Sequence, residues 1–460
     1  MENKYFNRFL VAYDFLLNGE VQPNATDFSD KKLVWQGYMH GSISSLNYVP
    51  TYLSDLDEYK DYKFLYFINP YSSFHRGFSD FNSDFIPGSI PNPTLKKLIN
   101  DKRFYLIIYY PNEGWVDYKS LQYIHSWFKN EGIDLNRMIL INSNFKIKKW
   151  YDEFREKSRM KSELHVLPHH WALDDVPTEY ISAAGDENQS MNMEYKVEHK
   201  KYDFNFLNRA NRRHRFLMIL NLYKENLVKN NLVSYDLNFD DSEFSGNETI
   251  YEKRRCDIQD FHNYYDDDSE YEYMLSLYNE LYETLPKKVV DFEDKKSIFG
   301  LQMETDIPYK DSMFTIVGES YFSENQNIGY ISEKVFKPIA HHHPFIIIGV
   351  PGLLKYLREL GFKTFEPYIN ESYDNEPNHF RRLEMVLQET KRLCNLSDDE
   401  KIKFMKHIEP IVKYNWNHLI YLFKNNYSWL EDKMREIGFE FESKEYVSPH
   451  PLDRESILWK

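Results

Sequence analysis

Cysteine, net positive charge and long apolar runs are all scarce in this sequence, and each shortage narrows the choice of protein class. Only two of the 460 residues are cysteines, Cys256 and Cys394, and they lie far apart without a metal-ligand spacing. This usage indicates a reducing compartment and argues against a cysteine-based metal knuckle. No run approaches the roughly 18–20 apolar residues that a membrane-spanning helix requires. Asp14 interrupts the apolar N-terminal stretch, so we expect no signal peptide and a cytoplasmic location.

The overall composition is that of a packed globular protein. Residues are 42% hydrophobic, tyrosine and phenylalanine are abundant, and no internal repeat or low-complexity tract is present. A chain of 460 residues is long enough for two domains with separate cores. The formal net charge of −15 argues against a surface coated in positive charge for nucleic acid. A local basic groove remains open, because basic residues gather at 146–150 and 157–161.

Short apolar runs alternate with helical patterns through the first half of the chain. The expected strands cover 63–68, 104–110, 138–142 and 164–167, with a further candidate at 33–37, and the expected helices cover 94–100, 121–130 and 147–157. Gly132 follows one of these helices and is a typical helix terminator. Because strands that alternate with helices build a parallel sheet, we predict an α/β domain over residues 1–190.

The second half is expected to begin after a polar stretch without periodicity at 183–200. A strand at 202–207 and a helix from 216 then open a second α/β domain over 201–375. Residues 236–270 are acidic and aromatic, and we interpret them as an insertion or a long loop. From 376 the chain is expected to turn helical, as far as about residue 437.

The stretch 314–365 has the clearest alternation: strand, loop, short helix, strand, helix and a final strand. Ser332 is a typical N-cap for the short helix, and an apolar strand at 345–349 follows it. We place Pro351 in the first turn of the next helix and Gly361 at its end.

Four arginines lie between the expected strand at 202–207 and the helix after it: Arg209, Arg212, Arg213 and Arg215. Cations at the amino end of a helix oppose its macrodipole, at a cost of roughly 0.3–1 kcal/mol each. A bound phosphate would reverse that sign, since guanidinium groups and free backbone N–H groups would face the same anion. Two interpretations stay open: a phosphate site, to which Arg209 is expected to contribute most, and a solvated basic turn that pairs with surplus carboxylates.

Ser332, Glu333 and Lys334 form a second candidate site at the start of the short helix. The carboxyl ends of parallel strands and the amino ends of helices both favour anionic ligands. In one interpretation Glu333 binds the two hydroxyls of a ribose and Lys334 binds a phosphate. In the other, this is an ordinary helix start in which Glu333 pairs with Lys337 one turn later. Pro338 is expected to kink the helix in either case.

Candidate general bases follow strands of the first domain. Glu113 comes just after a buried strand, which is a usual place for a catalytic carboxylate. His40, His169 and His170 occupy comparable loop positions and are alternative bases. The run His341–His343 is different: three consecutive histidines at a helix end cannot all face one ion, so we predict no metal site there.

Together these motifs resemble the donor-binding signature of α-1,3-fucosyltransferase-like glycosyltransferases, and even more closely the similar glycosyltransferases of bacteriophages and large viruses. The matching residues are Asn208–Arg215 before the first helix of the nucleotide domain, the Gly318-Glu319-Ser320 loop, Ile331–Pro338, the strand at 345–349 and the tail at 361–365. The resemblance covers about residues 204–375, and the first domain only in its order of strands and helices.

The resemblance implies a GT-B architecture, in which two Rossmann-like domains face one cleft. Residues 1–190 would be the acceptor side, 201–375 the donor side, and 376–460 C-terminal helices that pack back on the first domain. The implied catalytic residues are Glu113 as general base, with Arg209 and Lys334 as pyrophosphate ligands. The implied donor contacts are Arg209, Arg212, Arg213, Glu319, Ser332, Glu333 (to the ribose) and Lys334. Trp115 stands where the family has a proline, two residues after the base.

The implied activity is transfer of a sugar from a UDP- or GDP-sugar to an acceptor hydroxyl, with inversion and without a required metal ion. The acceptor is a glycan, a small molecule or a hydroxymethylated pyrimidine in viral DNA, and the net charge of −15 weighs against a duplex acceptor. An alternative from another class stays open: a non-catalytic glycan-binding or virion protein that keeps a GT-B shell.

Overall fold

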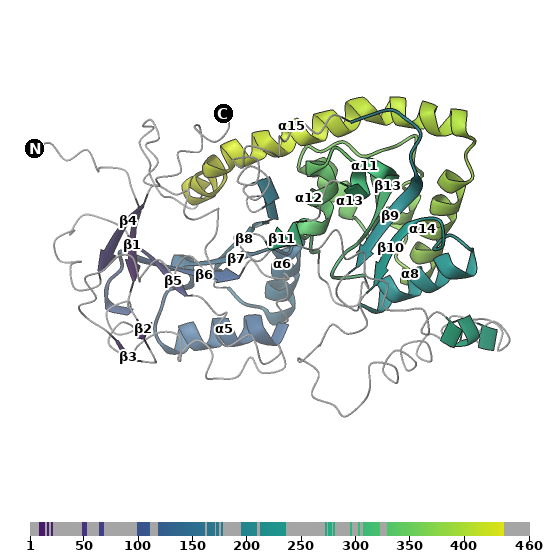
Figure 1. Cartoon of the computed structure of the whole chain (residues 1–460). Helices are drawn as coiled ribbons and strands as arrows, with labels where there is room; N and C mark the ends of the chain where they lie inside the picture. The colour runs from purple at the N-terminus through teal and green to yellow at the C-terminus, as the bar shows by residue number, and fades with distance from the viewer. Residues whose placement is uncertain are drawn as a thin grey trace, which may run out of the picture. The chain divides into compact units, whose positions relative to one another are not determined.

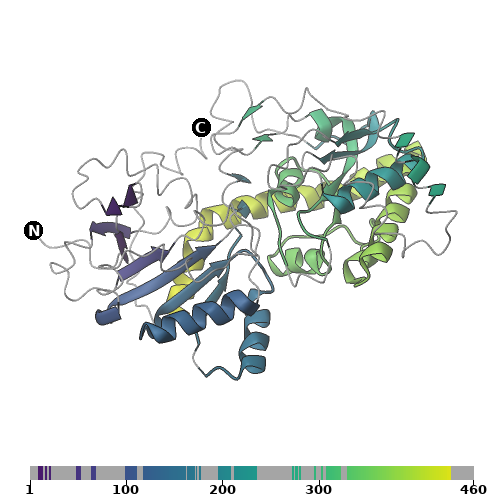
Figure 2. The same ribbon diagram turned by 90° about the horizontal axis from the view of Figure 1, so that it is seen from below.

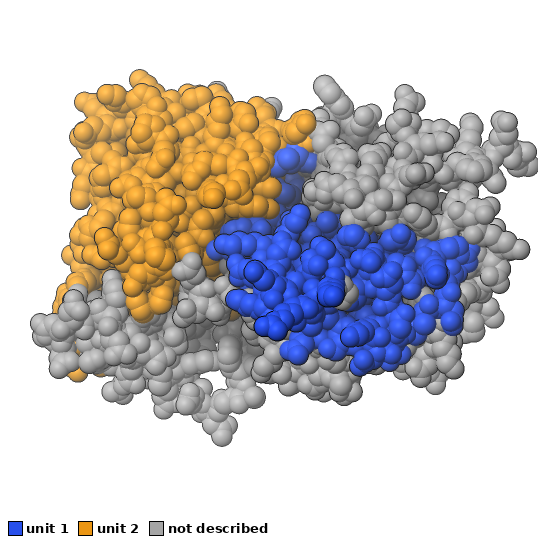
Figure 3. Space-filling view, turned by 180° about the vertical axis from the view of Figure 1, so that it is seen from behind, with its two compact units in different colours: residues 1–178, 327–330, 422–460 blue, residues 179–326, 331–421 orange. Residues whose placement is uncertain are grey.

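The computed structural model describes residues 99–110, 118–161, 163–170, 195–208, 212–235, 307–322 and 329–436 as continuous segments, and shorter segments elsewhere that include strands near the N-terminus. These residues form a mixed α/β protein that divides into two units (Figures 1 and 3). Unit 1 consists of residues 1–178, 327–330 and 422–460, and unit 2 of residues 179–326 and 331–421. Among the described helices, none has the length and apolarity to cross a membrane.

Unit 1 is built on a parallel sheet with the strand order β4-β1-β5-β6-β7-β8. Its strands are β1 (Phe9–Tyr13), β4 (Tyr48–Tyr52), β5 (Phe64–Ile68), β6 (Phe104–Tyr110), β7 (Met138–Asn142) and β8 (His165–Pro168). The connections contain α5 (Tyr118–Asn130), the 3-10 helix η3 (Leu135–Arg137) and α6 (Ile147–Ser158), and β2 (Leu16–Leu17) pairs with β3 (Glu20–Val21). Figure 2 shows α5 along one face of the sheet.

The sequence of β7 explains its central position in this sheet. All five of its residues are buried, which is typical of a parallel strand covered on both faces. The expected strands and helices between 63 and 168 are confirmed wherever the structure describes them, each to within three residues of its expected ends. Gly132 ends α5 with a φ of 72°, as predicted. The strand expected at 33–37 and most of the helix expected at 94–100 lie outside the described residues.

The short segment 327–330 belongs to unit 1 through the loop after β7. Asn144 Oδ1 accepts a hydrogen bond from Gly329 N at 2.8 Å, and Phe145 N donates to Gly329 O at 2.7 Å. Asn144 and Tyr330 also form an antiparallel bridge. A side chain at Gly329 has no room, because its Cβ would lie 2.8 Å from the Phe145 ring.

Unit 2 is built on a parallel sheet with the strand order β10-β9-β13-β14. Its strands are β9 (Tyr202–Asn208), β10 (Leu232–Tyr235), β13 (Ser312–Gly318) and β14 (Phe345–Ile348), and β11 (Lys295–Lys296) pairs separately with β12 (Gln302–Met303). Its helices are α8 (Arg213–Lys224), α11 (Ile307–Asp311), α12 (Glu333–Ala340), α13 (Leu353–Glu359), the 3-10 helix η7 (Ser372–Asn375), α14 (His379–Cys394) and α15 (Asp398–Glu436), which leaves unit 2 after Tyr421.

Helices cover both faces of the unit 2 sheet. α14 packs against α8, β9 and β14, whereas α12 packs against β13 and β14, and Figure 1 shows the two groups on opposite sides of the strands. β13 is buried along all seven of its residues, and the rings of Phe204 and Phe314 meet across β9 and β13 at 5.7 Å. The predicted strands at 202–207 and 314–317 are therefore confirmed, while all of 236–270 lies outside the described residues.

The final strand expected after Gly361 is wrong. Gly361 does end α13, with a φ of 94°, but the residues after it form no strand. Side chains take the place of strand partners: Lys363 N donates to Asn415 Oδ1 at 2.8 Å, and Phe365 N donates to Glu371 Oε1 at 2.6 Å. These side chains satisfy backbone N–H groups that a neighbouring strand would otherwise pair with.

The placement of Pro351 in a helix is also wrong. α13 begins at Leu353, after Gly352 with a φ of 85°, so the proline precedes the helix. The carboxylate of Asp374 accepts from the N–H groups of Leu354 and Lys355 at 2.9 and 3.0 Å. A capping group 20 residues away along the chain, rather than the proline, satisfies the first turn of α13.

Candidate functional site

The carboxyl edge of the unit 2 sheet gathers the amino ends of three helices. β9, β13 and β14 are parallel, so they end at one edge, at Asn208, Gly318 and Ile348. The helices α8, α12 and α13 begin after these three strands. Both the carboxyl ends of parallel strands and the amino ends of helices favour anionic ligands. The edge therefore has the general form of an anion-binding site.

The ends of β9 and β13 and the first turn of α8 are in close contact. A Cβ added at Gly318 would lie 2.9 Å from Arg215 Cγ and 3.1 Å from Asn208 Oδ1. Only glycine allows this approach without a shift of the neighbouring side chains. The Arg215 side chain therefore passes directly over the end of β13.

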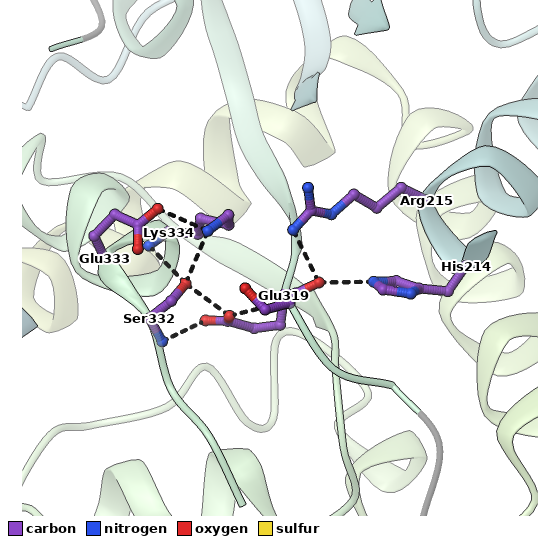
Figure 4. Close-up of polar contacts among 7 residues, drawn as sticks. His214, Arg215, Glu319, Ser332, Glu333 and Lys334 are labelled. Atoms are coloured by element: carbon purple, nitrogen blue, oxygen red, sulfur yellow. Dashed lines mark hydrogen bonds and ion pairs between the residues drawn. The ribbon is translucent and has the colours of Figure 1, made fainter. Parts of the chain in front are cut away.

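A buried carboxylate ties the end of β13 to the start of α12. Glu319 is fully buried; its Oε2 accepts from Ser332 Oγ at 2.7 Å, and its Oε1 accepts from Ser332 N at 3.0 Å (Figure 4). The Ser332 hydroxyl accepts in turn from the N–H of Lys334 at 3.2 Å, so Ser332 is the N-cap that the sequence predicts. We call Glu319, Ser332 and the Lys334 N–H the carboxylate clamp. The clamp fixes the residue at which α12 begins.

The backbone of Glu319 is held as well as its side chain. Its N–H donates to Ile348 O of β14 at 2.9 Å, and its carbonyl oxygen accepts from His214 Nε2 at 2.7 Å and from Arg215 Nη2 at 3.0 Å. Because a carbonyl oxygen only accepts, Nε2 of His214 carries a proton. Burial, followed by the charge of Arg215, lowers the pKa of His214 well below its usual value, so the ring is a neutral donor at pH 7.

Glu333 and Lys334 are the members of this edge that are partly exposed. Lys334 Nζ lies 2.7 Å from Glu333 Oε1, and the lysine and glutamate side chains are 29% and 16% exposed. Burial by itself raises the pKa of Glu333, but the charges of Lys334 and Lys337 outweigh it and lower the pKa to about 2. At neutral pH, Glu333 is therefore an anion that can accept hydrogen bonds from hydroxyls, next to a cation that can bind phosphate.

Arginine adds positive charge around His214. Burial is the largest cause of the lowered pKa of His214, and the charges of Arg215, Arg212 and Arg382 act in the same direction. Arg215 and Arg382 are buried, whereas Arg212 is exposed beside the first turn of α8. Charges act over longer distances in the protein interior than in water, so these cations favour an anion at the edge.

Arg382 holds the loops behind the edge. Arg382 is 1% exposed. Its guanidinium donates from Nε to Gly349 O at 3.0 Å, from Nη1 to Glu376 O at 2.7 Å, and from Nη2 to Phe322 O. It lies over the Phe322 ring, 4.7 Å from the centroid. One buried cation thus joins the loop after β13, the loop after β14 and the turn before α14.

The structure brings four of the predicted donor contacts together: Glu319, Ser332, Glu333 and Lys334. Glu319 is fully buried, whereas a side chain that contacts a ligand directly is expected to be accessible. Lys334 Nζ donates both to Glu333 Oε1, at 2.7 Å, and to Ser332 Oγ, at 3.3 Å. α12 continues through Pro338 as far as Ala340.

The arginine cluster and the candidate bases are only partly described. Arg212 is the N-cap residue of α8, and Arg213 is the first residue of that helix. Arg209, Glu113 and His40 lie outside the described residues, and their predicted roles stay predictions. Sequence reasoning assigned no role to His214 or Arg382; His214 lay within the arginine-rich motif, which was the one available signal.

The carboxyl edge of the unit 1 sheet has a different composition. Asn142 and Ser143 at the end of β7, and His169 and His170 after β8, are all buried. Nδ2 of Asn142 and Oγ of Ser143 have no hydrogen-bond partner among the described residues. Burial lowers the pKa of both His169 and His170 to about 3, so both rings are neutral at pH 7.

The histidine run after α12 has its own contacts. Nδ1 of His343 is 2.8 Å from Thr315 Oγ1, and Nε2 is 3.0 Å from Ser312 O, so hydrogen bonds occupy both ring nitrogens. The ring of His341 stacks on Tyr309 with a centroid distance of 3.9 Å. In the part of the chain that the structure describes, no group of three or more histidine, cysteine or acidic side chains is arranged to hold a metal ion.

Comparisons with known proteins find only weak structural similarity. No protein-family model matches the chain, and no curated protein matches it. A solved structure described as "alpha1,3-Fucosyltransferase with GDP" is 11% identical with a TM-score of 0.32, over 93% of this chain and 92% of that chain. The trehalose-6-phosphate phosphatase N-terminal domain of Candida albicans is 10% identical with a TM-score of 0.38, over 90% and 88% of the two chains. Similarities this low carry no functional argument, so the function must be argued from the residues of the edge.

Proposed function

We propose that the chain is a nucleotide-sugar-dependent glycosyltransferase, and that the carboxyl edge of unit 2 binds the nucleotide diphosphate of the donor. The observation that carries the proposal is the presentation of Glu333 and Lys334. Both are partly exposed at the first turn of α12, and the carboxylate clamp fixes the backbone that bears them. A carboxylate beside an ammonium group, with Arg212 and Arg215 nearby, suits a ligand that has hydroxyls next to anionic oxygens.

Donor binding would divide the Glu333–Lys334 ion pair between two parts of the ligand. Lys334 Nζ, now 2.7 Å from Glu333 Oε1, would donate to a diphosphate oxygen, and Glu333 would accept from the ribose hydroxyls. A charge-assisted hydrogen bond contributes roughly 1.5–3 kcal/mol, so the new bonds can offset the loss of a partly exposed ion pair. The amino ends of α8 and α12 add the positive ends of their helix dipoles, which attract the phosphate groups.

The proposed reaction is a single displacement. The acceptor hydroxyl oxygen attacks the anomeric carbon of the donor sugar, the bond from that carbon to the diphosphate oxygen breaks, and configuration inverts. Glu113 takes the acceptor proton as general base, as the family resemblance implies. Arg209 and Lys334 stabilise the charge of the departing diphosphate, so this assignment requires no metal ion.

The GT-B architecture belongs to the same proposal, with unit 1 on the acceptor side and unit 2 on the donor side. The acceptor would be a glycan, a small molecule or a hydroxymethylated pyrimidine of viral DNA. The buried neutral side chains of the unit 1 edge favour an uncharged polar acceptor group over a phosphate.

A thermal-shift screen against UDP, GDP, CMP, ADP and dTDP, with and without EDTA, tests the proposal. A ligand at about 100 times its dissociation constant adds about 2.7 kcal/mol of apparent stability. We expect one nucleoside diphosphate to stabilise the wild type with or without EDTA, and Lys334→Met to abolish most of the shift. Lys363→Met is the matched control, because Lys363 is an exposed lysine over the Tyr414 ring, away from the edge. If no nucleotide stabilises the wild type, the donor site is contradicted and a non-catalytic glycan-binding protein becomes the better hypothesis.

A further inference from the structure

We infer that Glu319 is a positioning residue of the proposed donor site: it holds the amino ends of α8 and α12 in a fixed arrangement and does not touch the ligand. The inference rests on the proposed function. It replaces the sequence-based expectation that Glu319 is itself a donor contact.

The side chain of Glu319 has little capacity left for a ligand. It is fully buried, and its two oxygens accept from Ser332 N, Ser332 Oγ and Ser320 N. A carboxylate offers about four acceptor positions, so these three donors use most of them. Burial raises the pKa of Glu319, and the nearby Lys334 charge opposes that rise, which is the behaviour of an enclosed carboxylate rather than a solvent-facing one.

The backbone of the same residue connects to the other helix. His214 and Arg215, in the first turn of α8, both donate to the Glu319 carbonyl oxygen. Figure 4 shows these two side chains converging on that oxygen from one side, while the Glu319 carboxylate turns towards Ser332 on the other. A continuous set of hydrogen bonds therefore runs from α8 through Glu319 to the N-cap of α12.

This connection has a direct consequence for the cationic groups. Arg215 lies in the first turn of α8 and bonds the Glu319 carbonyl, and Lys334 lies in the first turn of α12, two residues after the N-cap Ser332. A diphosphate that contacts both helix starts requires them at a fixed separation. Binding geometry that is held in advance lowers the ordering cost of the complex, so loss of Glu319 should weaken nucleotide binding although no ligand contact is lost.

Isothermal titration of GDP and UDP against a set of variants tests the inference. We expect Glu319→Ala and Ser332→Ala each to weaken binding about tenfold or more. Glu319→Gln keeps the shape and part of the hydrogen bonding, so it should weaken binding less and should remain folded. The control is Glu371→Gln, another buried carboxylate of unit 2, which accepts from Phe365 N and Arg358 Nη1. We expect it to lower the melting temperature and leave the dissociation constant unchanged.

The double variant separates positioning from direct contact. If Glu319 acts through Ser332, the double Glu319→Ala/Ser332→Ala variant should bind no more weakly than the weaker single variant, whereas an independent ligand contact predicts that the two effects multiply. Multiplying effects, or folded Glu319 variants that bind as tightly as wild type, would overturn the inference and leave the proposed function intact. If wild type itself binds none of the nucleotides of the thermal-shift screen, the proposed function fails and the inference fails with it.

Discussion

Both units bring the loops after neighbouring parallel strands to one edge of a sheet, β7 and β8 in unit 1 and β9 and β13 in unit 2. In unit 1 the buried polar groups there are amides, a hydroxyl and two neutral imidazoles, and neither Asn142 Nδ2 nor Ser143 Oγ has a hydrogen-bond partner among the described residues. In unit 2 the charged groups are the buried Glu319, Arg215 and Arg382 and the partly exposed pair of Glu333 and Lys334. Glu319 is bonded through its N–H, its carbonyl and both carboxylate oxygens.

Two parallel sheets with the same general construction therefore carry different side chains at their carboxyl edges. The backbone rule for parallel sheets predicts where a ligand would bind in each unit, but only the side chains tell which ligand. Charge that is held by hydrogen bonds in unit 2 suits an anion, whereas the buried side chains described at the unit 1 edge, Asn142, Ser143, His169 and His170, carry no charge at pH 7.

The largest expected effect comes from the buried cation of the unit 2 edge. Arg382→Met leaves the carbonyl groups of Gly349, Glu376 and Phe322 without their donor, so it should lower the free energy of unfolding by about 3–5 kcal/mol. Urea denaturation measures this. The neighbouring Arg381→Met is the control: its side chain is 72% exposed, and its ion pair with Glu376 should contribute at most about 1 kcal/mol. Equal losses of unfolding free energy in the two variants would contradict the claim that the buried Arg382 stabilises these loops.

The neutral edge of unit 1 should make stability depend on pH. The pKa of His169 is lowered to about 3 in the folded protein, so its stabilising contribution is present above about pH 6.5 and is lost as the pH falls towards 3, because the unfolded chain takes up the proton first. Between pH 7 and pH 5, His169→Gln should lose about 2 kcal/mol less than wild type in urea denaturation. The same loss in both proteins would show that this ring is protonated in the fold.

A smaller effect is expected at two glycines that differ in packing, Gly318 at the end of β13 and Gly132 after α5. At Gly318 a methyl group would meet Arg215 Cγ at 2.9 Å, so Gly318→Ala should cost about 1–3 kcal/mol and should also weaken nucleotide binding. Gly132 has a φ of 72° and no atom within 4 Å of an added Cβ, so Gly132→Ala should cost about 1 kcal/mol through the backbone alone. Thermal melts with and without GDP or UDP distinguish the two; an unchanged nucleotide shift in Gly318→Ala would contradict the close approach.

The smallest effect comes from one substitution made at both edges. Ser332→Ala removes an N-cap and a donor to Glu319, and should cost about 1–2 kcal/mol. Ser143→Ala removes a buried hydroxyl that has no partner among the described residues, so it should change stability by less than about 0.5 kcal/mol. A destabilisation of similar size in both variants would contradict the claim that the serine at the unit 2 edge is hydrogen-bonded and the one at the unit 1 edge is not.

The sequence predicted the elements with strong local patterns. The apolar run that became β7, the pattern of β14 and the cap of α12 by Ser332 all depend on residues within one strand or one turn. The strand expected after Gly361 is absent because two side chains satisfy that backbone: Asn415, 52 residues from Lys363, and Glu371, six residues from Phe365. Such contacts have no local pattern.

The candidate site was predictable in its members and not in their roles. Glu333 and Lys334 stand out as a charged pair at a helix start, and the structure places them there. The Glu319 carboxylate is bonded by Ser332, 13 residues later, and Arg382 bonds the carbonyl of Phe322, 60 residues earlier. A single sequence gives the residue types in such pairs, but the pairing itself arises only from tertiary packing.

Amide hydrogen exchange with and without the stabilising nucleoside diphosphate locates the bound ligand on one edge or the other. Binding at the unit 2 edge predicts slower exchange in peptides that span 204–217 and 314–336, and loss of that protection in Lys334→Met. Protection confined to residues 138–146 and 165–173 of unit 1, with exchange at the start of α12 unchanged, would contradict it.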